Sequence, residues 1–534
     1  MIAFQSCVTF SLFQLMLAAG VLVVFATAVT KTCNTRCYPG NDCFPSLTEI
    51  AMFQNTIDGF VVLPSNNTYT DVINMHNKLF TRFPAIVVMV LSTDDIKQSM
   101  LFAKRFNLHV VVKSSGHDYI GRSSWSGSIQ INLGYMRKMT VQLGSSRSVD
   151  GELTVEGGAN WQEIYQEVDK YNRVIVGGSS QTVSPSGYTL GGGHSILSRM
   201  LGLAVDQVLE MTVITVNGSI IKCTNHTSHI TNADESFSVT SDNSLFWALR
   251  GGGGGTFGIV SSFTFKLYKV KHQYVKVTMS YPLSINGNSS VGQEVMQFYS
   301  NFVKRMPNEW GGYSFLSNAQ QFTKTNDSVV GTLGFLYCHY GGWNDSSRKY
   351  MDLWNDFHPE WRLEYTVRNI STFWEGFGSV MTDSPWSRVY VTGSFIQEAG
   401  IDTNFLDFIV DTMTRPINAT NPLYACVGTH LGGKVSDFSD TPTHPGFRHA
   451  RLCLGCVVAI PDIKREDFYI QKGKELSQRL ISYGNGTYVN EAAEYMPNWQ
   501  QNYWGPHYSR LLSIKREVDP DNILTCHHCV GSEL

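Results

Sequence analysis

The chain has 534 residues, of which 43% are hydrophobic and 16% are charged, so it is long enough for more than one packed domain and too apolar for a disordered protein. Its formal net charge of −3 provides no basic surface for phosphate backbones, which excludes nucleic acid as an expected partner.

The first segment of the chain, residues 1–28, is apolar and uncharged. Ala26 and Ala28 have the A-x-A spacing of a cleavage site, so we expect a signal peptide and a secreted protein without stable membrane insertion. The apolar run is long enough to span a bilayer, and an uncleaved anchor is therefore the alternative. Residues 29–59 follow as a segment that contains cysteines.

The N-glycosylation sequons and the number of cysteines both favour an oxidising, secretory compartment. Loss of Cys7 with the signal peptide leaves ten of the eleven cysteines, an even number that favours disulfides. Cys453 with Cys456 and Cys526 with Cys529 have the spacing of zinc pairs. A strand-like run around the first pair would point residues three apart to opposite faces, so disulfides or buried thiols are favoured and no metal is expected. The nine sequons begin at Asn66, Asn217, Asn225, Asn288, Asn326, Asn344, Asn369, Asn418 and Asn485.

Residues 60–266 alternate between helical and strand patterns. An N-cap at Ser92 and apolar spacing predict a helix over 93–106, and the β-branched run that follows predicts a strand over 108–113. A second helix is expected at 160–171. Strands are expected at 153–158 and 208–223, the latter turning through a type I′ hairpin at Asn217 and Gly218.

Residues 267–463 have longer strand-like runs, such as 272–283 and 328–340, separated by helices such as 405–413. This pattern predicts a second domain on an antiparallel sheet. Its tryptophans, including Trp310, Trp343, Trp354 and Trp374, are either part of a pocket for a flat substrate or part of the core, and the core is favoured.

Three glycine-rich stretches, at 113–121, 184–210 and 249–267, lie in the first of these regions. Backbone N–H groups of such loops can hold phosphate oxygens. Gly253, Gly255 and Gly258 have the G-x-G-x-x-G spacing, but a strand-like run follows them where a Rossmann site needs a helix. Together the three loops predict a site for one large dinucleotide.

Four long motifs carry a resemblance that covers the chain from about Phe60 to its end. They are "KSSGHDYIG", "GGSSQTVSPSGYTLGGGHSILSRMLGLAVDQVL", "LRGGGGGTFGIVSSFTFKL" and "YVNEAAEYMPNWQQNYWGPHYSRLLSIKREVDPDNIL". These motifs closely resemble the berberine-bridge-enzyme-like FAD-linked oxidoreductases of the vanillyl-alcohol-oxidase superfamily. The resemblance implies an α+β fold with a PCMH-type FAD-binding domain of two αβ subdomains. Residues 60–266 and the returning segment 464–534 would form that domain, and residues 267–463 would form an inserted substrate domain on an antiparallel sheet.

The resemblance also implies which residues hold the cofactor. His117 would bond covalently to the 8α-methyl carbon of FAD, and the loop around it would bind the pyrophosphate. Many relatives have a second tether from a cysteine, but Ser180 stands there in this chain, and a hydroxyl is too weak a nucleophile to replace a thiolate. Attachment through His117 only is therefore expected. The cofactor-binding residues expected by motif position are Ser114, Ser115, Gly116, His117, Asp118, Val183, Ser184, Gly187, Gly191, Gly192, His194, Gly258, Ile259 and Tyr508.

Departures from the family pattern bear on catalysis. Plant relatives that cyclise alkaloids or cannabinoids carry a glutamate near the position of Gly455, and other plant relatives have a tyrosine base where this chain has Glu491. We therefore expect Glu491 to be the catalytic base, with Tyr119 and Tyr488 as further catalytic candidates. The alternative is that Glu491 caps a turn or pairs with an arginine or lysine. His507 is a polar candidate near the flavin.

The function implied by the resemblance is that of a secreted oxidase. A small organic alcohol, amine or secondary metabolite would pass a hydride to the covalent FAD, and O2 would accept the electrons and give hydrogen peroxide. In relatives the residue matching Val183 gates oxygen, and valine there goes with oxidase behaviour. A monomer is expected. The alternative is a non-catalytic secreted glycoprotein that uses the flavin fold for binding or storage.

Overall fold

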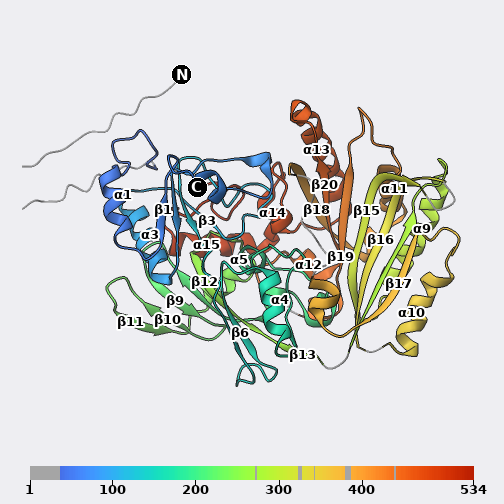
Figure 1. Ribbon diagram of the computed structural model, residues 1–534, viewed down its shortest axis with the longest axis horizontal. Helices are drawn as coiled ribbons and strands as arrows, with labels where there is room; N and C mark the ends of the chain where they lie inside the picture. Colours follow the sequence, from blue (N-terminus) through green and yellow to red (C-terminus); the bar gives the residue numbers. More distant parts are fainter. Residues whose placement is uncertain (1–35, 271–272, 323–326, 342, 379–386, 438–439) are drawn as a thin grey trace, which may run out of the picture.

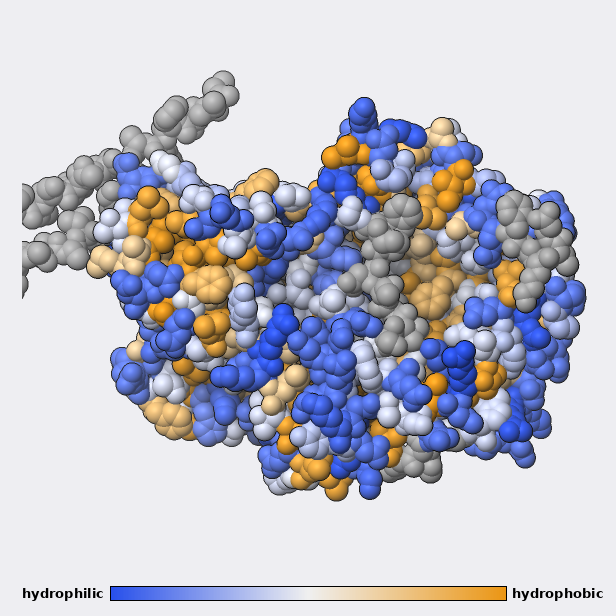
Figure 2. All heavy atoms as spheres, viewed as in Figure 1, coloured by the Kyte–Doolittle hydropathy of each residue, from blue (hydrophilic) through white to orange (hydrophobic). Residues whose placement is uncertain are grey.

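The computed structural model describes residues 36–270, 273–322, 327–341, 343–378, 387–437 and 440–534, and Figure 1 shows two domains side by side. We define the first domain as residues 36–269 with 484–534, and the second as 274–483. No helix among the described residues is long and apolar enough to cross a bilayer. The expected signal peptide lies outside the described residues. Apolar side chains gather on the surface at the α1 end of the first domain (Figure 2), where Leu47 and Met52 are exposed.

The first domain contains two sheets and a two-stranded ribbon. The smaller sheet has the order β1-β2-β4-β3, in which β2, β4 and β3 run parallel. The larger is antiparallel with the order β11-β10-β9-β8-β12-β6-β5, and β13 pairs with β7. The strands are β1 (Phe60–Val62), β2 (Ile86–Met89), β3 (Val110–Lys113), β4 (Ile129–Asn132), β5 (Met139–Gln142), β6 (Glu152–Glu156), β7 (Arg173–Val174), β8 (Val208–Ile214), β9 (Ile220–Cys223), β10 (Ser228–Thr231), β11 (Phe237–Thr240), β12 (Ile259–Lys266) and β13 (Tyr268–Lys269).

Helices of the first domain begin where the sequence places caps. The side chain of Ser92 accepts a hydrogen bond from Asp95 N and starts α3, and Asn160 forms a capping box with Glu163 that starts α4, so both helix predictions are confirmed. The helices are α1 (Leu47–Gln54), α2 (Tyr69–Val72), α3 (Thr93–Arg105), α4 (Trp161–Asp169), α5 (Pro185–Leu190), α6 (Ser198–Leu201), α7 (Ala204–Gln207), α8 (Ser244–Leu249), α14 (Trp499–Trp504) and α15 (Tyr508–Val518).

The hairpin between β8 and β9 differs from the predicted type I′ turn. Gly218 has a φ of +82°, but Asn217 is not among the residues with positive φ, which a type I′ turn requires at both positions. Gly218 N instead donates to Thr215 O, and Thr215 N donates to Ser219 O. The prediction was wrong because an Asn-Gly pair also fits a longer loop in which only the glycine is left-handed.

The second domain is built on the antiparallel sheet that the sequence predicts, with the order β17-β14-β16-β15-β19-β20-β18. Alternate residues of β19 and β20 face opposite sides, and the register pairs Val427 with Gly455 on one face and Cys426 with Cys456 on the other. Its elements are β14 (Tyr274–Pro282), α9 (Ser290–Lys304), β15 (Trp310–Phe322), β16 (Ser328–Tyr340), α10 (Asp345–Asp356), β17 (Glu364–Ile370), β18 (Val389–Gln397), α11 (Thr403–Met413), β19 (Tyr424–His430), α12 (Pro445–His449), β20 (Ala450–Ala459) and α13 (Glu466–Tyr483).

The chain returns to the first domain later than the expected boundary at residue 464. Helix α13 still packs on the second sheet, where Ser477 is hydrogen-bonded to Thr392 of β18 at 2.5 Å between hydroxyl oxygens. After Gly484 the chain reaches the first domain and lies beside β3, where Val110 N donates to Ile523 O at 3.0 Å. The boundary was missed because the amphipathic pattern of α13 does not say which sheet the helix covers.

The cysteines from Cys37 onward divide into disulfides and buried thiols, as the sequence predicts. Cys456 of the first suspected zinc pair is bonded to Cys426 across the sheet, whereas Cys453 stays a buried thiol. The described disulfides are Cys37–Cys43, Cys426–Cys456 and Cys526–Cys529.

Two of the named tryptophans lie in the core, and the described sequon asparagines lie at the surface. Trp310 and Trp354 are fully buried, so they belong to the core, as favoured. The sequon asparagines are all exposed except Asn326, which lies outside the described residues.

Candidate active site

A cavity of about 470 Å³ is lined by residues of both domains. The first domain contributes the three glycine-rich stretches and parts of the C-terminal segment, and the second contributes the face of β15, β19 and β20 that points away from α9. Distant parts of the sequence therefore meet at one site, as the glycine-rich loops predict.

His117 lies in the loop that follows β3. Its Nε2 is 2.8 Å from Oγ1 of Thr182, and its ring stacks on His76 with a centroid separation of 4.5 Å. A second contact joins the same two loops, because Ser184 N donates to Oγ of Ser115 at 3.1 Å. The imidazole is thus held in a defined orientation in the cavity wall.

Glycines in the wall leave room for a ligand. A β-carbon on Gly187 would meet no atom within 4 Å, and those on Gly254 and Gly255 would meet none closer than 3.7 Å and 3.9 Å. Side chains at these positions would fill the cavity. Gly116, beside His117, has a φ of +79°, a conformation that favours glycine. This lining fits a large ligand that lies close to the backbone.

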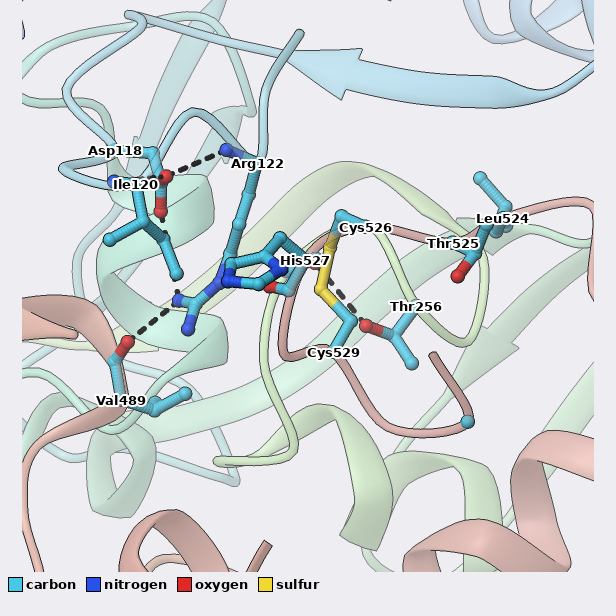
Figure 3. Close-up of a disulfide and its surroundings, with 12 residues drawn as sticks. Asp118, Ile120, Arg122, Thr256, Val489, Leu524, Thr525, Cys526, His527 and Cys529 are labelled. Atoms are coloured by element: carbon cyan, nitrogen blue, oxygen red, sulfur yellow. Dashed lines mark hydrogen bonds and ion pairs between the residues drawn. A yellow bond between two sulfur atoms is a disulfide. The ribbon is translucent and has the colours of Figure 1, made fainter. Parts of the chain in front are cut away.

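A half-buried arginine links the His117 loop to the C-terminal segment (Figure 3). Arg122 donates to Val489 O at 2.7 Å and to His527 O at 3.1 Å, and its backbone N donates to the Asp118 carboxylate. Its Nη2 atom is buried without a hydrogen-bond partner among the described residues. An unpaired guanidinium nitrogen in the cavity wall suits an anionic group such as a pyrophosphate. The Cys526–Cys529 disulfide closes the loop that holds His527, and Cys526 also lines the cavity.

Glu491 and His194 form a pair in another part of the wall. Oε1 of Glu491 is 3.0 Å from Nε2 of His194, whose Nδ1 is 2.9 Å from Oγ1 of Thr429 on β19. The Glu491 carboxylate also fills the space that a β-carbon on Gly455 would take. The pair therefore sits against the second sheet with its imidazole held at both nitrogens.

Tyr488 lies beside this pair. Its hydroxyl oxygen accepts from Gly193 N at 3.0 Å and from Nδ2 of Asn490 at 2.9 Å. Burial, reinforced by the Glu491 carboxylate, raises the pKa of the Tyr488 phenol well above its ordinary value. The phenol is accordingly neutral at physiological pH and is suited to donate its proton in a hydrogen bond.

The second domain contributes a mostly apolar wall. Ala425 and Val427 of β19 lie opposite Val457 and Gly455 of β20, and all four line the cavity. Tyr313 of β15 is the aromatic member, and burial raises the pKa of its phenol to about 12. None of these five side chains carries a charge, so this wall suits an uncharged, largely apolar molecule.

Most of the predicted site residues line the cavity, although their roles stay predictions. Gly191 packs against Asn490, Gly192 against Phe447, and Tyr508 against Trp499 and Trp504, so these three are not brought to the wall. His507 lies beside Trp247. The sequence reasoning missed His76, Arg122 and Thr429, which lie outside the four motifs, and Thr182, which lies inside one of them but was given no role. The predicted residues in the wall are Ser114, Ser115, Gly116, His117, Asp118, Tyr119, Val183, Ser184, Gly187, His194, Gly258, Ile259, Tyr488 and Glu491.

Two family models match this chain. The model described as "FAD binding domain" matches residues 84–224, and the model described as "Berberine and berberine like" matches residues 487–531. These ranges contain the His117 loop and Glu491, the two ends of the candidate site.

Curated relatives cover most of the chain. An uncharacterised FAD-linked oxidoreductase of Arthroderma benhamiae is 27% identical over 84% of this chain and 78% of its own length. The FAD-linked oxidoreductase apf9 of Gibberella fujikuroi is 26% identical over 96% of each chain. The VAO-type flavoprotein oxidase VAO615 of Thermothelomyces thermophilus is 26% identical over 85% of this chain and 77% of its own.

Solved structures share the fold. The VAO-type flavoprotein MtVAO713 of Myceliophthora thermophila has a TM-score of 0.79 at 22% identity, covering 93% of this chain and 97% of its own. The BBE-like 1 protein of Physcomitrella patens has a TM-score of 0.72 at 15% identity, covering 90% of this chain and 99% of its own. At these identities the likeness extends to the fold alone.

Proposed function

The chain is a berberine-bridge-enzyme-like FAD-linked oxidoreductase of the vanillyl-alcohol-oxidase type, and we propose that it is a secreted oxidase of a small alcohol, amine or secondary metabolite. When bound, FAD supplies the acceptor for a substrate hydride and passes the electrons on to dioxygen, which leaves as hydrogen peroxide.

The residues that would hold FAD are those of the glycine-rich loops and of the His117 loop. Their open backbone positions at Gly187, Gly254 and Gly255 and the unpaired Nη2 of Arg122 support this assignment. His117 would be the one covalent attachment point, because a serine stands at position 180. The contact between Nε2 and Thr182 orients the ring for that bond.

The observation that carries the catalytic proposal is the 3.0 Å contact between Glu491 and His194 in the cavity wall. Glu491 is proposed to take the hydroxyl or amine proton of the substrate as its carbon loses hydride. His194, held at Nδ1 by Thr429, would contact one carboxylate oxygen through Nε2 and leave the other to face the substrate. Tyr488 lines the same cavity and would hydrogen-bond the same substrate heteroatom, and Tyr119 lines the cavity beside His117.

The second-domain wall supports an uncharged substrate. An anion would have no positively charged partner among Tyr313, Ala425, Val427, Gly455 and Val457, and a carbohydrate would find few hydrogen-bond donors and acceptors there. Exposed sequon asparagines and three disulfides agree with secretion.

Purified protein tests the proposal directly. A yellow colour that survives acid precipitation, bleaching under anaerobic conditions with a member of an alcohol and amine panel, and peroxide release on admission of air are the expected results. A colourless protein that takes up no FAD would instead favour the non-catalytic binding or storage protein.

A further inference from the structure

A thiol lies next to the Glu491–His194 pair. One donor atom from each of His194, Cys453 and Glu491 lies within 4.8 Å of those of the other two. The Cys453 side chain comes from β20, where it stands directly opposite Thr429 of β19. Nitrogen, sulfur and carboxylate oxygen are the three donor types that zinc takes in proteins, and donors around one tetrahedral zinc are separated by about 3.3–3.8 Å. To reach that geometry the 3.0 Å contact between His194 and Glu491 would open slightly, and any donor as far away as 4.8 Å would move inward.

The neighbouring threonine supplies a second, independent feature. Histidines that bind metals usually donate their other ring N–H to a nearby acceptor, which fixes the tautomer and the ring. Oγ1 of Thr429 is 2.9 Å from Nδ1 of His194, so Nε2 is directed toward the carboxylate and the thiol. His194 and Glu491 both line the cavity, which leaves a fourth coordination position for water.

We propose that His194, Cys453 and Glu491 form a binding site for a divalent cation of the zinc type, and that the bound cation reversibly inhibits the enzyme. The sequence predicts no metal because a strand would point Cys453 and Cys456 to opposite faces, and in the structure Cys456 is bonded to Cys426. The three ligands come instead from distant segments of the chain.

Charge balance favours the complex. Binding converts the Cys453 thiol to a thiolate and releases its proton to solvent, while no atom changes oxidation state. The thiolate and the Glu491 carboxylate then neutralise the two positive charges of the cation in a site that is largely closed to solvent. The proposed base Glu491 and the histidine that orients it both become metal ligands, so turnover stops until a chelator removes the ion.

Titration of the purified flavin-loaded protein with Co²⁺ tests the site without any substrate. We expect one ion per chain, with the sulfur-to-metal and d–d absorption of tetrahedral cobalt bound by a thiolate, displacement by Zn²⁺, and reversal by EDTA. Cys453→Ser should lose the sulfur-to-metal band, and Thr429→Val should weaken binding about 10–100-fold. Cys338→Ser is the matched control, because Cys338 is a buried thiol of another part of the sheet.

The absence of the sulfur-to-metal band in the unsubstituted protein, or its persistence in Cys453→Ser, would overturn the proposal. If Cys453→Ser does not fold, Cys453→Ala and Glu491→Gln test the same ligands, and unchanged Co²⁺ affinity in both would also overturn it. Metal binding is read without turnover, so this result is separate from whether Glu491 is the base.

Discussion

The carboxylate of Glu491 occupies the place that a side chain at position 455 would take on β20. Gly455 lies opposite Val427, and both line the cavity. Relatives that place a glutamate near this position of the strand bring a carboxylate to the same region from the sheet. This chain brings one from the 3₁₀ turn Val489–Glu491 of the C-terminal segment.

Gly455→Ala should displace the Glu491 carboxylate and slow the reductive half-reaction at least tenfold, because a misplaced base loses much of its contribution. Gly334→Ala is the matched control, since Gly334 lies in the same sheet with no atom within 3.7 Å of a new β-carbon. Both variants should fold. Rapid anaerobic mixing with a substrate found in the panel measures the rate, and equal rates in the two variants would separate Glu491 from catalysis.

Glu491→Gln keeps the shape of the side chain and removes its basicity. Flavin reduction should slow by about a hundredfold or more, a typical contribution of general-base catalysis, while the flavin spectrum and its attachment stay unchanged. An unchanged reduction rate and pH profile would place the base elsewhere, with Tyr119 the next residue to substitute.

His117→Ala should yield protein whose flavin is released by acid, because His117 is the one attachment residue expected from the motifs. Mass spectrometry of peptides from the unsubstituted protein should find the flavin on His117. Flavin on another residue would refute the assignment. Thr182→Val is a useful companion, since loss of the contact to Nε2 should lower the attached fraction without removing the nucleophile.

Val183 is expected to leave room for dioxygen, so the reduced protein should reoxidise rapidly in air. Val183→Leu should slow that step more than tenfold with little effect on anaerobic reduction. Stopped-flow mixing of reduced protein with oxygen decides between an oxidase and a dehydrogenase. Reduced flavin that persists for minutes in the unsubstituted protein would contradict the oxidase assignment.

Glu494 makes stability depend on pH. Burial raises the pKa of its carboxyl to about 7, against the opposing effect of Arg82 and Arg122 and with the help of Asp118. The folded state therefore favours the protonated Glu494 carboxyl. Its contribution to the free energy of unfolding is complete below the ordinary carboxyl pKa and is lost as pH rises through about 7. Glu494→Gln should therefore melt at a higher temperature than the unsubstituted protein at pH 8, with a smaller difference at pH 5.

The control for that pH series is Glu517→Gln, at an exposed position of α15. Its melting temperature should follow that of the unsubstituted protein at both pH values. Equal curves for Glu494→Gln and the control would show that the buried carboxyl does not titrate as described.

Local signals made several features predictable. Helix α3 follows from the cap at Ser92 and its apolar spacing, and the His117 loop follows from small residues after a β-branched strand. Pairings that depend on the register of distant strands have no such signal. The contact between His194 and Glu491 joins residues separated by 297 positions, and Thr429 reaches His194 only because β19 lies beside β20 and β15.

The motifs also led us to expect cofactor contacts from residues that lie outside the cavity wall. Gly191, Gly192 and Tyr508 lie in the recognised motifs, yet their neighbours in space are protein side chains. A motif records that a residue is needed locally, and packing between segments is as common a reason as contact with a ligand.

The hydrogen bond between Val110 and Ile523 sets an order of events during biosynthesis. The strand that leads into the His117 loop gains this partner, and Arg122 gains its contact with His527, only from a segment that is translated long after them. A ribosome-bound chain that ends before residue 484 has already made the tether histidine and the whole second domain, but it lacks one side of the cavity. The complete cavity therefore forms only after the segment 484–534 has joined the first domain.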